Sequence, residues 1–169
     1  MENLWRTTHR QDNNEYELAI SWDDESFIEG QPTIQLAVTV RRGEAEPRSV
    51  TAEVALVNNS NDGAPDLVLR IQGKEIVTIP LADLIDETQI IDRIPGWAYG
   101  AGDLLTGCLV RAGLSSLLGQ VIRCKNSTRH LPWYFPRIQA IGECLKQNLG
   151  RIGARTAWRA AKCVITAGF

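Results

Sequence analysis

The hydrophobic pattern of this sequence changes its period once, close to Pro80, and the change limits the folds that the chain can adopt. Before Pro80, apolar and polar residues alternate, as in TIQLAVTVRR (33–42). After it, apolar residues recur three or four positions apart, which is typical of one face of a helix. We therefore expect an α+β protein, with an N-terminal antiparallel β-sheet or partial sandwich followed by a C-terminal bundle of about three helices.

The front of the chain contains about five candidate strands. Alternation is clearest over 33–42 and 49–57, where every second residue is apolar. Such strands are half-buried, because one face of the sheet contacts the core and the other contacts water. YELAISW (16–22) is predicted to be a further strand, and 66–81 is predicted to form a hairpin that turns at Gln72–Gly73.

Three helices are expected in the rear of the chain, over about 103–122, 137–149 and 151–166. Gly150 is predicted to end the second of them, since glycine is favoured just beyond a helix C-terminus. The connection CKNSTRHLPWYFP (124–136) is rich in proline and aromatic residues. It should therefore contain little regular structure.

Charge divides the chain near the same place as the periodicity. Residues 1–99 contain 18 acidic and 8 basic residues, whereas residues 100–169 contain 10 basic residues and two acidic ones, Asp103 and Glu143. The net charge of -2 therefore conceals an acidic half and a basic half. We predict an acidic β-rich module over 1–95, a glycine-rich hinge over 96–102 and a basic helical module over 103–169.

The last predicted helix carries four cations at helical spacing: Arg151, Arg155, Arg159 and Lys162. At 100° per residue they fall within about 80° of one another on the helix circumference, with Trp158 at their border. Like charges four positions apart repel each other in an isolated helix. We therefore expect an anionic partner to bind this stripe.

Three kinds of anionic partner fit the stripe. The first is an acidic protein surface, on the chain's own front half or on another subunit. The second is nucleic acid, because arginine binds phosphate and neighbouring aromatic residues could stack on bases, although the pI of about 5.7 argues against it. The third is an anionic membrane surface, because an apolar segment (104–122) precedes the basic helix. The predicted partner-binding residues are Arg151, Arg155, Arg159, Lys162, Trp158, Trp133 and Tyr134.

All four cysteines, at positions 108, 124, 144 and 163, lie in the basic half. They contain no CxxC pair, so no metal site is expected. The polar first residues differ from a secretory signal peptide, so we expect a cytoplasmic protein, in which these cysteines would be free thiols on packed helix faces. Export by a dedicated system is the alternative, and two disulfides would then staple the helices together.

No catalytic or cofactor signature is recognisable in the sequence. GAGDLLTG (100–107) lacks the lysine of a phosphate-binding loop, and Cys108 and His130 lack an acid that would orient the histidine. We therefore expect no cofactor and favour a non-enzymatic interaction or assembly subunit whose basic helical half docks an anionic partner. The alternative is a membrane-active or exported effector whose acidic N-terminal half shields a cationic amphipathic C-terminal half.

Overall fold

A computed structural model describes residues 2–11, 13–58, 63–95, 98, 104–133 and 135–166 of the chain. Within these ranges, the side chains at 2, 3, 7, 9, 11, 104–106, 108, 109, 152–158 and 160–166 are left undescribed. The strands are β1 (Glu2–Gln11), β2 (Asn14–Asp23), β3 (Thr33–Arg42), β4 (Arg48–Val57), β5 (Asp66–Ile71) and β6 (Lys74–Pro80). The helices are α1 (Asp24–Ile28), α2 (Thr88–Ile91), α3 (Leu104–Ser127) and α4 (Phe135–Thr166), with a 3-10 turn, η1, at Leu81–Asp83.

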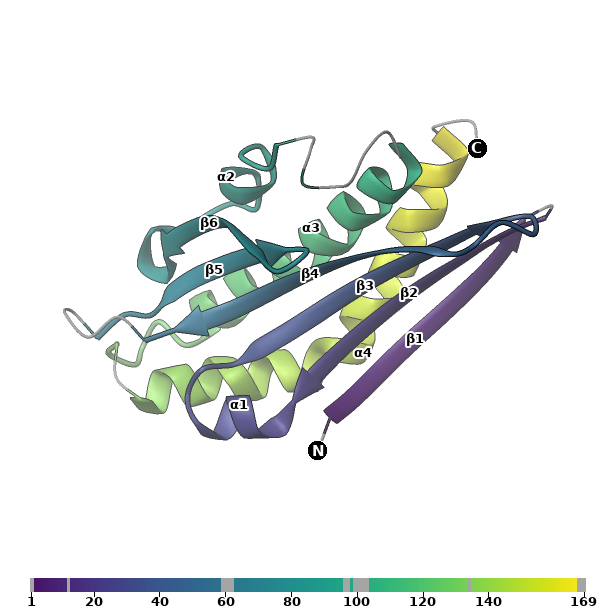
Figure 1. Ribbon diagram of the computed structural model, residues 1–169. Coiled ribbons are helices and arrows are strands. Elements are labelled where there is room, and N and C mark those ends of the chain that lie inside the picture. Colours follow the sequence, from purple (N-terminus) through teal and green to yellow (C-terminus); the bar gives the residue numbers. More distant parts are fainter. Residues whose placement is uncertain are drawn as a thin grey trace.

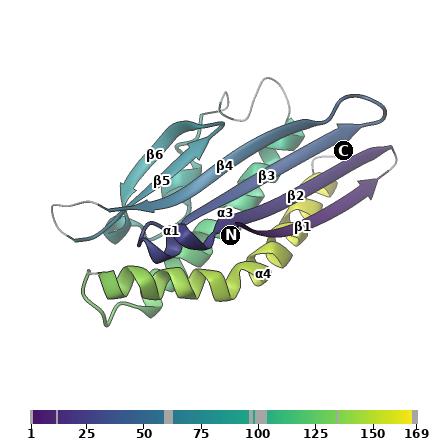
Figure 2. The same cartoon turned by 60° about the horizontal axis from the view of Figure 1, so that its bottom comes forward.

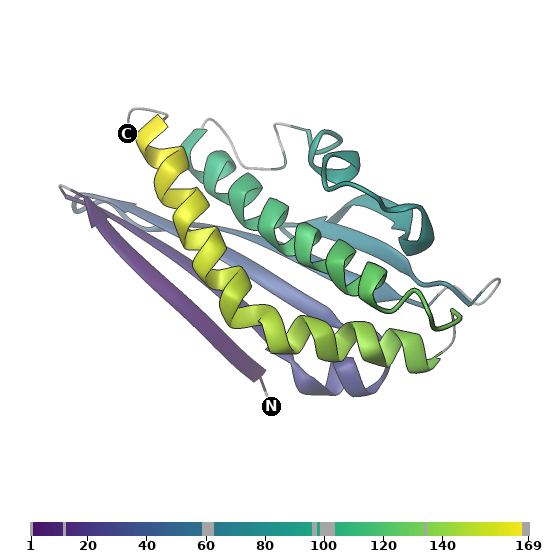
Figure 3. The same cartoon turned by 180° about the vertical axis from the view of Figure 1, so that it is seen from behind.

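The six strands form one antiparallel meander in which every strand pairs with the next one along the chain (Figure 1). The two long helices cover one face of this sheet, as the view from behind shows (Figure 3). α3 packs against β3 and β4, while α4 packs against α3, β1 and β2. The α+β class predicted from the hydrophobic periodicity is confirmed.

The helix-facing side of the sheet and the inner sides of the helices form one hydrophobic core. Alternate residues of β3, such as Leu36 and Val38, contribute to it together with Leu114 and Leu118 of α3. The two layers approach closely at Gly113, where an added Cβ would lie 2.5 Å from Leu36 Cδ2. Most of the predicted hinge over 96–102 lies outside the described residues, so the division into modules stays a prediction.

The predicted hairpin at Gln72–Gly73 is confirmed. The φ angles of these two residues are 53° and 78°, as a two-residue turn between twisted strands requires.

The strands differ from expectation at one edge of the sheet. The polar segment that forms β1 was not predicted to be a strand. It pairs with β2 along its whole length, from Glu2↔Asp23 to Gln11↔Asn14. An edge strand has only one neighbour, so its place in the sheet depends on that partner more than on its own pattern.

The two last helices predicted from the sequence are one helix. α4 continues through Gly150, so the predicted end at that residue is wrong. Glycine ends a helix when it adopts a left-handed conformation, and Gly150 is not among the glycines with positive φ. α4 bends along its length (Figure 3), and α3 runs on to Ser127, into the predicted irregular connection.

Candidate functional site

The outward face of the helical layer gathers exposed cations. Arg111 and Arg123 are exposed on α3, on either side of an arc that contains small residues such as Ser115 and Gly119. Arg151 and Arg159 are exposed on α4. Arg159 reaches across to α3, where its Nη1 donates a 2.7 Å hydrogen bond to Ser115 Oγ. We call these four arginines the basic helical face.

The two arginines that α4 contributes to the basic helical face form no ion pair with any acidic side chain among the described residues. Glu143 is the one acidic residue in the sequence between 104 and 166. Among the described side chains, Arg151 forms no ion pair or hydrogen bond, and the partner of Arg159 is a neutral hydroxyl. The positive charge of these two arginines is therefore available to a partner.

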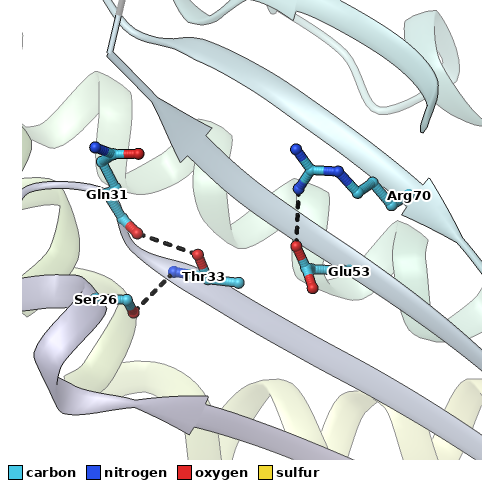
Figure 4. A network of polar contacts seen from close by, with 5 residues as sticks. All are labelled: Ser26, Gln31, Thr33, Glu53 and Arg70. Atoms are coloured by element: carbon cyan, nitrogen blue, oxygen red, sulfur yellow. Dashed lines mark hydrogen bonds and ion pairs between the residues drawn. The ribbon is translucent and has the colours of Figure 1, made fainter. Parts of the chain in front are cut away.

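Several acidic residues of the sheet are paired with arginines of the sheet itself. The ion pairs Arg6–Glu17, Arg10–Glu15 and Arg70–Glu53 join neighbouring strands, with N–O distances of 3.3, 3.2 and 2.8 Å. The Arg70–Glu53 pair links β5 to β4 (Figure 4). Lys146 of α4 pairs with Asp24 of α1 at 3.0 Å and so joins the two layers. The acidic charge of the sheet is thus partly engaged within the sheet.

The other predicted partner-binding residues fall into two groups. The side chains of Arg155, Trp158 and Lys162, and the whole of Tyr134, lie outside the described residues. Trp133 is half-buried and packs against the hydrophobic core, and the guanidinium carbon of Arg137 lies 3.6 Å from its ring centroid.

Trp133 lies away from the α4 part of the basic helical face. It precedes the first residue of α4, while Arg151 lies sixteen residues further along that helix than Phe135, or about 24 Å at 1.5 Å per residue. The structure therefore brings Arg159 to Ser115 but leaves Trp133 at the far end of the helical layer.

Sequence reasoning missed a cationic cluster at the C-terminal end of α3. Lys125 Nζ donates hydrogen bonds to the carbonyl oxygens of Ala82 and Leu84, at 3.0 and 2.6 Å. Burial and the neighbouring charge of Arg137 lower the pKa of Lys125, while Asp83 opposes this shift. Arg137 Nη2 in turn donates a 3.1 Å hydrogen bond to the carbonyl oxygen of Lys125.

This cluster has a structural explanation. Arg137 is 7% exposed, and burial lowers its pKa. Arg137 donates to a carbonyl group at the end of α3, where negative partial charge stabilises a positive group, and Lys125 donates to carbonyl groups of the turn after β6. Lys125 thereby ties the turn after β6 to α3. No local pattern in the sequence signals this contact, because its partners are backbone oxygens more than forty residues away.

A disulfide between Cys124 and Cys144 joins α3 to α4, with a Cα–Cα distance of 5.7 Å. The expectation of free thiols is therefore wrong for this pair. It rested on the expected compartment, whereas the packing of the two helices brings these side chains within bonding geometry. Gln120 Nε2 also lies 3.6 Å from Cys124 Sγ. The side chains of Cys108 and Cys163 lie outside the described residues.

In the part of the chain that the structure describes, no group of histidine, cysteine and carboxylate side chains could hold a metal ion. Comparisons of the chain with protein-family models, with curated proteins and with solved structures find no match.

Proposed function

We propose that this protein is an interaction or assembly subunit, without catalytic activity, whose basic helical face docks an acidic protein surface. The observation that carries this proposal is the exposure of Arg151 and Arg159 without a described acidic partner. These arginines lie on a layer whose two helices contain one acidic residue, while 18 of the 20 acidic residues lie within residues 1–99. A charge distribution of this kind steers and orients an oppositely charged partner.

An acidic protein is a better partner for this face than nucleic acid. Nucleic acid carries negative charge along its whole length, so strands that extend beyond the helices would approach the acidic sheet layer of the same molecule. A protein can restrict its negative charge to a patch of matching size. The excess of acidic over basic residues in 1–99 thus supports the choice of a protein partner.

The test is a double charge reversal, Arg151→Glu with Arg159→Glu. Both side chains are exposed, so the fold should be retained. Binding of the full chain to poly-glutamate, measured by fluorescence anisotropy, should weaken by about tenfold or more. A matched control, Arg41→Glu with Arg93→Glu, makes the same charge change at exposed arginines outside α3 and α4 and should bind nearly as well as the native chain.

The same variants decide between partner classes. Short single-stranded DNA and phosphatidylserine vesicles serve as the competing probes. Equal binding by the double reversal and the native chain would refute the proposal. Much tighter binding to DNA or to vesicles, if the double reversal weakens it, would assign the basic helical face to that class of partner instead.

A second candidate function is supported by the Cys124–Cys144 disulfide. Disulfides form and persist mainly in oxidising compartments, which favours an exported effector over a cytoplasmic subunit. In that reading the acidic N-terminal half shields the cationic helical half until the protein reaches its target. None of the described helices has the length and hydrophobicity of a membrane-spanning segment. Alkylation of the protein in acid-quenched cells tests the compartment, because free thiols at both positions would support the cytoplasmic alternative.

A further inference from the structure

A small pocket lies between α1 and the first half of α4, two elements that lie side by side in Figure 2. Its volume is about 240 Å³. Phe27 is buried beneath it, and an added Cβ at Gly142 would lie 3.2 Å from Phe27 Cδ2, so the glycine keeps the two elements close. The lining residues are Phe27, Ile28, Gln139, Gly142, Glu143 and Lys146.

Hydrogen bonds hold α1 in place beside this pocket. Asp23 Oδ1 accepts a 3.0 Å hydrogen bond from the Glu25 amide and so caps the helix. Ser26 Oγ accepts a 3.2 Å hydrogen bond from the Thr33 amide, which anchors α1 to β3, as Figure 4 shows. The Lys146–Asp24 ion pair ties the same helix to α4. The pocket is therefore largely preformed, which lowers the entropic cost of binding.

Exposed apolar side chains lie at the pocket and next to it. Ile28 lines the pocket and is 70% exposed. Phe135, which is 45% exposed, lies one helical turn before Gln139 and packs over Gly30, where an added Cβ would lie 2.6 Å from its ring. Two of the four exposed large apolar side chains among the described residues are therefore in this region.

The charge around the pocket is negative. Glu143 lines it and is exposed, and Glu25 and Glu29 are exposed on and just after α1. Lys146 also lines the pocket, but its charge is paired with Asp24. A partner with positive charge is therefore complementary to this rim, in contrast to the basic helical face.

We propose that this pocket binds a segment of a partner protein in which a large apolar side chain is flanked by lysine or arginine. The volume is below the roughly 300–1,000 Å³ of pockets that take drug-sized ligands, but it suits a single leucine or phenylalanine side chain. The acidic rim receives the flanking cations, and the exposed amide of Gln139 can bond to the backbone of the segment. None of the residues that line this pocket belongs to the basic helical face, and the proposal goes beyond the proposed function.

The test uses the full chain and the blocked peptide Gly-Lys-Phe-Lys-Gly, with amide NMR spectra as the readout. Two controls replace the central phenylalanine by alanine or both lysines by glutamate. The first peptide should shift the amide signals of Gly142 and Glu143 in a saturable way. Both control peptides should bind about tenfold more weakly or not at all.

Two pocket variants and two matched controls locate the binding. Ile28→Ser removes the exposed apolar wall and Glu143→Lys reverses the rim, so each should weaken peptide binding by about tenfold. Ile85→Ser and Glu46→Lys change exposed residues elsewhere and should leave peptide binding unchanged. All four alter exposed side chains, and a thermal melt checks that each variant keeps its fold.

Three results would overturn the proposal: no saturable shift, equal binding of the glutamate-flanked peptide, or full binding by Ile28→Ser. Self-association that Ile28→Ser abolishes in sedimentation experiments would assign the pocket to a second copy of the chain and would also overturn it. Reversal of Arg151 and Arg159 leaves the pocket unchanged. The two proposals can therefore fail independently.

Discussion

Removing the Cys124–Cys144 disulfide should cost about 3 kcal/mol of unfolding free energy. The two residues are 20 positions apart, and closing a loop of about that length removes roughly 11 cal/mol/K of chain entropy from the unfolded state. At about 25 °C this corresponds to about 3 kcal/mol, or a decrease in Tm of roughly 6–12 °C for a chain of this size.

The assay is urea unfolding of Cys124→Ala, Cys144→Ala and the double variant, without reductant. The crosslink needs both sulfur atoms, so each single variant should already lose nearly the whole 3 kcal/mol. The double variant should then lose little more, which gives a coupling energy of about 3 kcal/mol in the double-mutant cycle. Additive losses of about 1 kcal/mol or less per site would show that the sulfurs are not bonded and would refute the reasoning.

Two glycines of α3 and the half-buried Lys125 give further expected outcomes. Gly113→Ala should destabilise the protein by about 1–3 kcal/mol in urea unfolding, because its Cβ would overlap Leu36. Gly119→Ala should stabilise the protein by up to about 1 kcal/mol through helix propensity, because a Cβ added there meets nothing within 4 Å. Equal effects of the two substitutions would contradict the close packing of α3 on β3. Burial and the charge of Arg137 hold the pKa of Lys125 below 10.5 in the folded state, so the unfolded state retains this proton to higher pH than the folded state does. The contribution of Lys125 to the free energy of unfolding should therefore rise as the pH increases from the lowered pKa to 10.5. Unfolding of Lys125→Met across alkaline pH should lack this rise, and an unchanged pH profile would show that the lysine is not desolvated.

The α+β class could be predicted because it depends on local patterns. Alternation over 33–42 and 49–57 corresponds to β3 and β4, whose apolar residues face the helices. The turn at Gln72–Gly73 was predictable for the same reason, since its conformation depends on two adjacent residues. Each of these features is encoded within a few positions of the chain.

Two of the features that were missed depend on contacts with another element of the fold. β1 is a strand because β2 pairs with it, whereas the two predicted final helices are one because Gly150 does not adopt the left-handed conformation that ends a helix. The Cys124–Cys144 bond depends on the packing of α3 against α4, whereas the sequence favoured free thiols over the disulfide alternative. A local pattern carries little information about such contacts.

The candidate surfaces also combine features that the sequence reveals with features that only the structure reveals. The sequence by itself determined that acidic residues concentrate in the front of the chain and basic residues in the rear, since charge is a property of composition. Only the tertiary structure decided which of these charges face water without a partner. It left Arg151 exposed, paired Lys146 with Asp24, and placed Ile28 beside Glu143 at a preformed pocket, because packing the helices on one face of the sheet selects which side chains meet.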